Sequence, residues 1–165
     1  MAVRIKNLDK VISQLKAYRK RTEEKVEILM ERLSTLGAYR ARVEFSRAMY
    51  AGKNDTVVSV ETTSKGFRIS AEGEAVIFIE FGTGVINPEH PLSAEFGYAH
   101  GTYGQGKGAN PNGWVYVGEQ GNAGSPIRDG AYRTRGNPPA RAMYNSAEEM
   151  RDELFRIAKE VFSHD

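Results

Sequence analysis

Apolar residues recur every three or four positions through the first third of the chain, as expected for one face of a helix. Lys, Arg and Glu side chains occupy the opposite face. Gly37 follows the apolar face and predicts the end of this helix, because glycine tolerates the left-handed conformation common at helix ends. A helix of about thirty residues is about 45 Å long, so it either protrudes, packs against a neighbouring subunit or bends back over its own sheet. The apolar face consists of Leu8, Val11, Ile12, Leu15, Tyr18, Thr22, Val26, Leu29, Leu33 and Leu36.

Residues 38–51 are expected to form a second helix or a continuation after a kink at Gly37. Arg40, Arg42 and Arg47 lie here among aromatic side chains, a combination found on nucleic-acid-binding surfaces and at protein interfaces. We favour the interface, because Glu44 and the acidic residues upstream interrupt any continuous cationic surface.

The pattern changes to that of strands after a turn at residues 52–55. Residues 56–62 are rich in β-branched side chains, and residues 67–72 alternate between apolar and polar. A third apolar segment, residues 76–81, has the length of a buried strand or a short buried helix; it carries Glu80 and breaks at Gly82. Three such segments joined by short turns predict an antiparallel β-meander over residues 56–83, covered by the helices.

Residues 84–136 read as a long glycine-rich excursion. Thirteen of the 17 glycines lie between Gly82 and Gly136, and all six prolines lie at or after Pro88. Aromatic residues are nevertheless spread through this stretch, which argues against a disordered linker. Residues 114–117 are expected to form one short strand. A long insertion without its own core is usually functional, as a binding loop or as an arm that orders against a partner.

Regular periodicity returns after the excursion. Asn137 followed by Pro138 and Pro139 predicts a helix start, and an apolar face then runs to about Phe162. We expect this closing helix to pack on the sheet. The prediction is one α+β domain over residues 1–165, divided into a basic helical segment (1–53), the meander (56–83), the excursion (84–136) and the closing helix (137–163).

Composition narrows the possible functions. The chain has no cysteine, which excludes disulfides, thiolate nucleophiles and cysteine-based metal sites. The first residues lack the apolar core of a signal peptide, and no apolar run is long enough for a membrane span, so we expect a protein made in the cytoplasm without a membrane partner.

Charge is distributed unevenly along the chain. The net charge is +2, yet residues 1–53 contain 13 Lys or Arg against 6 Asp or Glu. This asymmetry fits a basic surface for nucleic acid, complementary patches between identical subunits, or a solvated helix face.

Motifs for catalysis or cofactor binding are weak. Residues 101–107 have the spacing of a phosphate-binding loop, but Gly108 replaces the required hydroxyl residue and no buried strand precedes the motif. The histidines show no metal-ligand spacing. Glu80 is the only carboxylate inside an apolar run; we expect it to be a paired structural acid or a cap on the following backbone amides, rather than a hydrolase residue acting with His90 or His100. We therefore predict no catalytic residue, metal or cofactor.

One set of motifs resembles a known family. The motifs are Phe78-Ile79-Glu80-Phe81-Gly82-Thr83-Gly84, His90-Pro91, Gly97 with Gly101-Thr102-Tyr103-Gly104 and a Gly-Lys-Gly, Trp114, Gly136-Asn137-Pro138-Pro139-Ala140, and Met143-Tyr144 ahead of Glu149-Met150. In this order they resemble the neck or tail-completion proteins of long-tailed bacteriophages and prophages, also called head-tail joining proteins. The resemblance covers most of the chain and is most specific at residues 78–84 and around Pro138.

The resemblance implies a non-enzymatic structural virion protein made in a bacterial host. Such a protein would assemble as a homo-oligomeric ring at the head-tail junction, against other neck or tail proteins, with at most weak nonspecific contact to DNA. The alternative is a nucleic-acid-binding module that uses the basic first third. The residues that we assign to structural or interface roles are Glu80, Gly82, Thr83, Gly84, Tyr103, Trp114, Tyr116, Arg40, Arg42 and Arg47.

Overall fold

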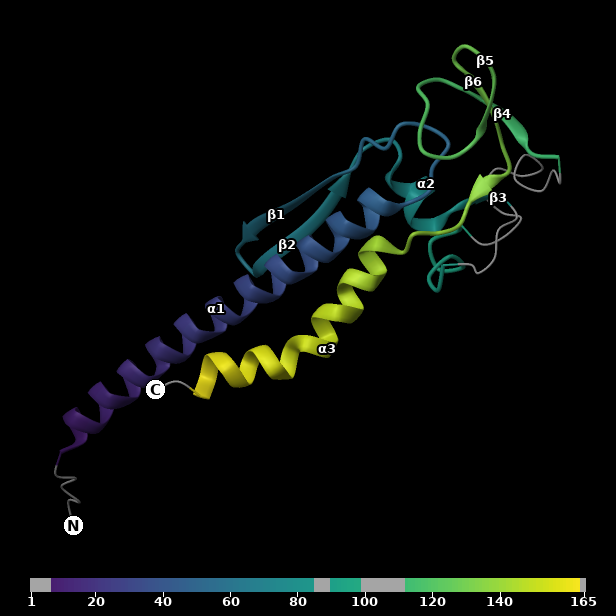
Figure 1. Cartoon of the computed structure of the whole chain (residues 1–165). Helices are drawn as coiled ribbons and strands as arrows, with labels where there is room; N and C mark the ends of the chain where they lie inside the picture. The colour runs from purple at the N-terminus through teal and green to yellow at the C-terminus, as the bar shows by residue number, and fades with distance from the viewer. Residues whose placement is uncertain (1–6, 85–89, 99–111, 164–165) are drawn as a thin grey trace.

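The computed structural model describes residues 7–84, 90–98 and 112–163, and it confirms the α+β class (Figure 1). The helices are α1 (Leu8–Arg47), α2 (Val76–Phe81) and α3 (Ala142–Ser163). The strands are β1 (Val57–Thr63), β2 (Gly66–Glu72), β3 (Thr83–Gly84), β4 (Trp114–Val117), β5 (Ser125–Arg128), β6 (Ala131–Thr134) and β7 (Gly136–Asn137).

The first helix continues through Gly37 to Arg47, so the helix end predicted at Gly37 is wrong and the alternative of a continuation is correct. α1 spans 40 residues and is about 60 Å long at 1.5 Å per residue. Gly37 instead lies where α1 meets α3: its carbonyl accepts a hydrogen bond from the Ser146 hydroxyl at 2.8 Å, and an added Cβ would lie 2.5 Å from Met150 Sδ. The helix ends at Arg47, and the Asn54 side chain donates to the Phe45 carbonyl of the last turn at 2.8 Å.

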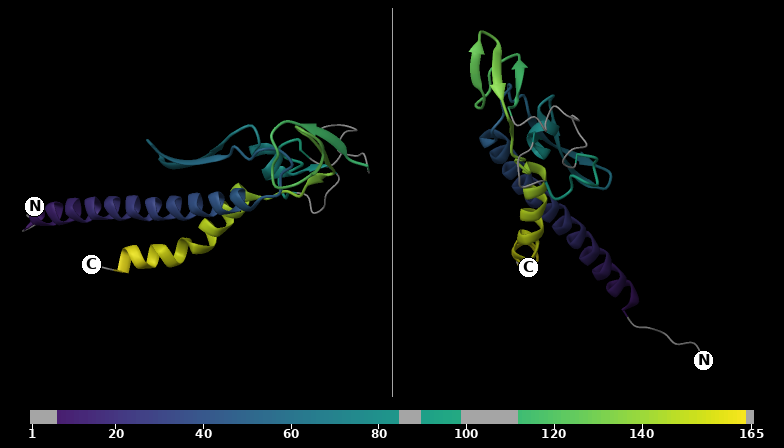
Figure 2. Two further views of the ribbon diagram at one scale, coloured as in Figure 1. Left: turned by 45° about the horizontal axis from the view of Figure 1, so that its top comes forward. Right: turned by 90° about the vertical axis from the view of Figure 1, so that its right-hand side faces the viewer.

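α1 forms the spine of the molecule. The β1–β2 hairpin lies along one side of α1 and α3 along the other (Figures 1 and 2). Buried side chains from α1, β1, α2 and the first turn of α3 make the core: Ala38, Ala41, Phe45, Ala48, Val58, Ala75, Ile79 and Ala142.

The N-terminal part of α1 extends beyond this body as an arm. We define the arm as residues 8–22, about four turns of helix. α3 ends beside the start of the covered part of α1, where Lys25 Nζ lies 5.9 Å from the Phe162 ring centroid. Both views in Figure 2 show the arm projecting past the end of α3, so the helix protrudes, one of the arrangements expected from its length.

The predicted three-stranded meander is a two-stranded hairpin followed by a helix. β1 and β2 pair antiparallel from Val57↔Glu72 to Thr63↔Gly66. The third apolar segment forms α2, because the Asp55 carboxylate accepts the backbone N–H groups of Glu74 and Ala75 at 2.8 and 2.9 Å and so fixes the chain at the helix start. The prediction of a third strand is therefore wrong, and the alternative of a short buried helix is correct.

The excursion contains more regular structure than predicted. β4 confirms the expected strand at residues 114–117, and it joins β6 and β5 in an antiparallel sheet of order β4-β6-β5. β3 pairs with β7, Thr83 opposite Asn137 and Gly84 opposite Gly136, which brings the two ends of the excursion together.

The closing helix begins later than predicted. Asn137 is buried in β7 rather than capping a helix, and α3 starts at Ala142. Arg141, just before the helix, has a positive φ of 56° and donates its N–H to the Glu80 carbonyl at 3.2 Å. The backbone just before α3 is therefore held by Glu80 of α2, which lies 62 positions before Ala142 in the sequence.

Candidate functional site

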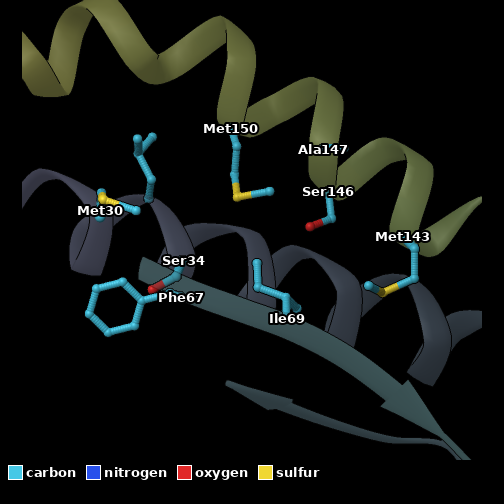
Figure 3. Close-up of a pocket in the computed structure, with 9 residues that line it drawn as sticks. Met30, Ser34, Phe67, Ile69, Met143, Ser146, Ala147 and Met150 are labelled. Carbon is cyan, nitrogen blue, oxygen red and sulfur yellow. The ribbon is translucent and has the colours of Figure 1, made fainter. Parts of the chain in front are cut away.

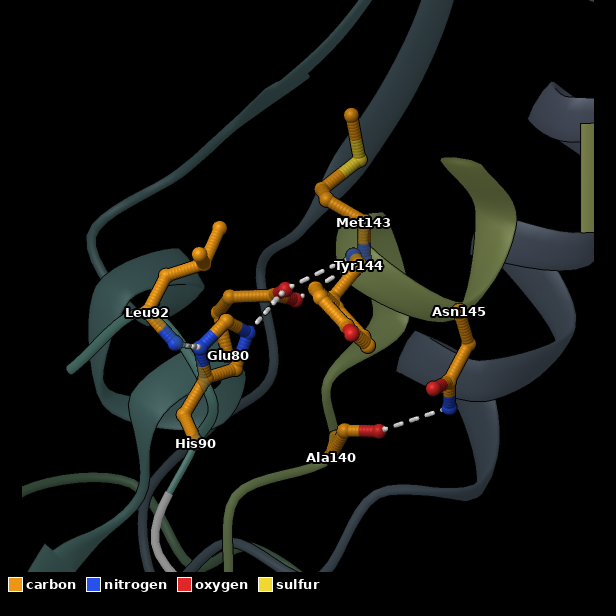
Figure 4. Close-up of polar contacts among 7 residues, drawn as sticks. All are labelled: Glu80, His90, Leu92, Ala140, Met143, Tyr144 and Asn145. Carbon is orange, nitrogen blue, oxygen red and sulfur yellow. Dashed lines mark hydrogen bonds and ion pairs between the residues drawn. The ribbon is translucent and has the colours of Figure 1, made fainter. Parts of the chain in front are cut away.

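Glu80 lies at the junction of α2, residues 90–98 and α3, where its side chain is 8% exposed. Oε2 accepts the backbone N–H of Met143 at 2.9 Å, and Oε1 accepts that of Tyr144 at 3.1 Å (Figure 4). These amides belong to the first turn of α3, whose N–H groups have no partner within the helix. Glu80 therefore caps α3 with its carboxylate at the positive end of the helix dipole.

His90 completes this cluster from the other side. Its side chain is 2% exposed, and its Nε2 lies 3.1 Å from Glu80 Oε1. Its Nδ1 accepts the backbone N–H of Leu92 at 3.0 Å, so Nδ1 carries no proton and Nε2–H is the donor to Glu80. The ring also lies 4.5 Å from the Phe81 ring centroid and 5.4 Å from that of Tyr144.

The hydrogen-bonding atoms of this cluster are engaged by groups of the chain itself. The Glu80 carboxylate already accepts three hydrogen bonds, and both ring nitrogens of His90 are engaged. A general base needs a lone pair within reach of a substrate, and here the carboxylate and the ring are both buried. The hydrolase hypothesis thus correctly pairs Glu80 with His90, but the geometry makes the pair a tether between three segments. His100 lies outside the described residues.

Gly82 and Thr83 form a second polar junction at the neck of the excursion. Thr83 Oγ1 donates to Asn137 Oδ1 at 2.6 Å, and the Asn137 amide donates to the Phe78 carbonyl at 3.0 Å. Gly82 has φ 78°, and a Cβ there would lie 2.7 Å from the Pro139 nitrogen. These contacts connect the end of α2 to the segment leading into α3, so the structural roles expected for Glu80, Gly82 and Thr83 fit the geometry.

Trp114 and Tyr116 lie on β4, far from the Glu80 cluster in sequence, and both are half-buried. They line a cavity of about 230 Å³ with Tyr50, Phe78 and Asn137. Gly84 is in β3, paired with Gly136. Tyr103 and the phosphate-loop-like motif at residues 101–108 lie outside the described residues.

The three arginines do not form one surface. Arg40 Nη2 lies 2.6 Å from Glu44 Oε1, and Arg40 Nε lies 3.3 Å from Glu149 Oε2 without hydrogen-bond geometry. Arg42 donates from Nε and Nη2 to the Val58 carbonyl at 3.2 and 3.0 Å, which joins α1 to β1. Arg47 is exposed. Two of the three guanidinium groups therefore have partners within the chain.

The described part of the chain leaves much of its apolar surface in water. Nineteen large hydrophobic side chains are exposed, whereas six of the thirteen buried hydrophobic residues are larger than alanine. The exposed set includes Leu15 at 62% and Tyr18 at 63% in the arm, and Phe155 at 85% in α3. Large exposed apolar patches mark interaction sites.

A hollow of about 340 Å³ opens between α1, α3 and β2, and we call it the groove. Figure 3 shows side chains from all three elements facing it. Ser34 and Ser146 are its buried members, and the other lining residues are half-buried or exposed. Sequence reasoning missed the groove, because its members lie far apart in the chain; they include Met30, Phe67, Ile69, Met143, Ala147 and Met150.

Residues 7–84, 90–98 and 112–163 contain no group of three or more His, Cys, Asp or Glu side chains placed to hold a metal ion. Within the same ranges, no helix is both long and apolar enough to cross a bilayer.

No protein-family model, curated protein or solved structure matches the chain. The resemblance to phage neck proteins therefore stays a prediction carried by the sequence motifs.

Proposed function

We propose that this protein is a non-enzymatic structural component of a tailed-phage or prophage particle, located at the head-tail junction. It acts by assembling with copies of itself into a ring and by docking to neighbouring neck or tail proteins. The observation that carries the proposal is the excess of exposed over buried large hydrophobic side chains among the described residues. Such a surface is typical of a subunit that is covered by neighbours in an assembly, rather than of an isolated monomer.

The polar clusters support the same reading. Hydrogen bonds with one another and with backbone groups engage the side chains of Glu80, His90, Thr83 and Asn137. They fix α2, the ends of the excursion and α3 relative to one another. A rigid body with a projecting arm presents defined surfaces to neighbours, which a repeating ring requires.

The location can be tested in particles of a phage or induced prophage that encodes the chain. An epitope tag at the C-terminus, followed by immunogold labelling of purified particles, should place gold at the head-tail junction. Gold along the tail, at its tip or only in the unassembled protein fraction would contradict the proposal. Untagged particles provide the control for nonspecific labelling.

The alternative is a nucleic-acid-binding module, which rests on the exposed basic residues of the first third. Residues 8–21 contain five Lys or Arg against one Asp. Such a module would bind duplex DNA with an affinity that falls steeply with salt. The ion pair of Arg40 and the backbone contact of Arg42 reduce the cationic surface available to it.

A further inference from the structure

The arm carries an apolar stripe that nothing in the described chain covers. Leu8, Val11, Ile12 and Leu15 have the spacing i, i+3, i+4, i+7, and each is more than 40% exposed. Further along α1, the face from Ser34 to Phe45 is buried, whereas the stripe lies past the end of α3 (Figure 2). The arm therefore has the surface of a packed helix without a partner.

The groove is also an apolar surface without a packed neighbour. It is lined largely by apolar side chains that remain half-exposed, so its walls face water instead of a packed neighbour. Three of them are methionines (Met30, Met143 and Met150), whose unbranched side chains adapt to an incoming surface. An amphipathic helix with anchors at i, i+3, i+4 and i+7 is the form of ligand that such a groove accepts.

Charge indicates which kind of helix would bind in the groove. The arm is basic: Lys10, Lys16 and Arg21 are exposed on it, and its other two cations, Arg19 and Lys20, pair with Glu23 and Glu24 of the same helix. The residues that line the groove are uncharged, but the helices on either side of it carry a net negative charge. Residues 22–31 of α1 contain four Glu against one Lys, and α3 contains five Asp or Glu against three Lys or Arg. Glu27 lies one turn before Met30, and Glu153 one turn after Met150, on the helices that line the groove. A second copy of this chain supplies both the apolar anchors and the opposite charge.

We propose that the arm of one copy docks in the groove of a second copy. The arm and the groove are different surfaces of the chain, so each copy can place its arm on one neighbour and bind the arm of another in its own groove. Such heterologous contacts close into a ring when the rotation between copies allows it. This inference rests on the proposed function for its premise of self-assembly, and it names the contact that would build the ring.

Disulfide trapping tests the contact directly, because the natural chain contains no cysteine. Leu15→Cys places a thiol on the stripe, and Ala147→Cys places one at an exposed position lining the groove. Equal amounts of the two variants are mixed under mild oxidation, resolved without reductant and mapped by peptide mass spectrometry. The proposal predicts a disulfide between positions 15 and 147. Ser13→Cys, exposed on the other side of the arm, is the matched control and should give much less product with Ala147→Cys.

The other outcomes overturn the proposal. Self-crosslinking of Leu15→Cys without the mixed product would show that arms pair with each other. Oligomers on native mass spectrometry without the mixed disulfide would refute this contact while leaving a ring intact. A chain that is monomeric and uncrosslinked at every concentration would also refute it, and the proposed location would then be decided by the labelling of particles alone.

A second pair of variants checks the energetics. Leu15→Glu should raise the protein concentration needed for assembly by about tenfold or more, because it removes an apolar anchor that docking would bury. Ser13→Glu introduces the same charge on the other side of the arm and should leave that concentration nearly unchanged. Equal effects of the two variants, or binding of the wild-type arm to anionic phospholipid vesicles by a chain that stays monomeric, would contradict the proposal.

Discussion

Replacing Glu80 by Gln should destabilise the protein by removing the cap of α3. The carboxylate offers two oxygens to three donors, the N–H groups of Met143 and Tyr144 and the His90 ring. The amide of Gln has nearly the same shape but one oxygen, and its NH₂ group would face a donor. At least one buried N–H then loses its acceptor, and the remaining bonds lose their charge.

The size of this effect follows from those contacts. An unsatisfied buried donor costs about 1–3 kcal/mol, and a bond to a neutral acceptor is about 1 kcal/mol weaker than one to a charged acceptor. Gln also avoids burying a charge, which offsets part of the loss. We expect the free energy of unfolding to fall by about 2–4 kcal/mol, a large part of the ~5–15 kcal/mol typical of a domain. The melting temperature should fall by about 5–15 °C for a chain of this size.

Urea unfolding followed by circular dichroism gives the free energy, and hydrogen exchange gives its location. The amides of Met143 and Tyr144 should lose protection relative to those in the middle of α3. Glu72→Gln, at an exposed position of β2, is the control and should change the free energy of unfolding by less than about 0.5 kcal/mol. If Glu80→Gln matched this control and left the two amides protected, the assignment of Glu80 as the cap would be wrong.

Three further substitutions follow from the same geometry. Gly82→Ala should lower the free energy of unfolding by about 2 kcal/mol or more, since it combines positive-φ strain with a Cβ 2.9 Å from the Asn137 carbonyl. Gly130 has a similar φ and nothing within 4 Å of an added Cβ, so Gly130→Ala should cost only the strain. Equal losses of stability in thermal unfolding would contradict this comparison. Asn137→Ala should destabilise the protein by about 2–4 kcal/mol, because the Phe78 carbonyl loses its side-chain donor and the Thr83 hydroxyl loses its acceptor; urea unfolding without a shift in midpoint would refute this. The N–H groups of Ala75 and Glu74 hold the pKa of the Asp55 carboxyl below its ordinary value of 3.8, so the stabilisation from Asp55 is complete above that pH and is lost as the pH falls through the lowered pKa. Asp55→Asn should therefore flatten this acid limb of a stability–pH curve, and an unchanged limb would count against the role of Asp55 in fixing the chain before α2.

Local patterns predicted the elements whose structure depends on neighbours in sequence. The apolar periodicity gave the long first helix and the closing helix, and the alternation at residues 67–72 gave β2. β4 was also predicted within its observed bounds. β5 and β6 were missed although Asp129-Gly130 between them is a strong signal for a two-residue hairpin turn.

The errors occurred where distant residues decide the structure. Gly37 reads locally as a helix end, but the approach of Met150 and Ser146 from α3 makes a residue without a side chain fit inside a continuous helix. Asn137 and the two prolines read as a helix start, but pairing with Thr83 draws Asn137 into β7. Glu80 was expected to be a paired structural acid or a cap on the amides that follow it; it pairs with His90, and the amides that it caps belong to a helix more than sixty positions later.

The candidate site was predictable only in part, for the same reason. The apolar run around Glu80 marked its carboxylate as unusual, and one hypothesis named His90 as its partner. The groove gave no such signal, because Met30, Ile69 and Met150 come together only in the fold. The apolar stripe of the arm was visible in the sequence, but whether the chain itself covers it was not.

We propose that this chain joins heads to tails, and particle assembly in its absence is the most direct test. The gene would be deleted from a phage or prophage that encodes it, and heads, tails and joined particles would be counted by electron microscopy with and without the wild-type chain supplied from a plasmid. We expect full heads and complete tails that stay separate, and joined particles when the wild-type chain is restored. Joined, infectious particles in its absence would refute a role in head-tail joining.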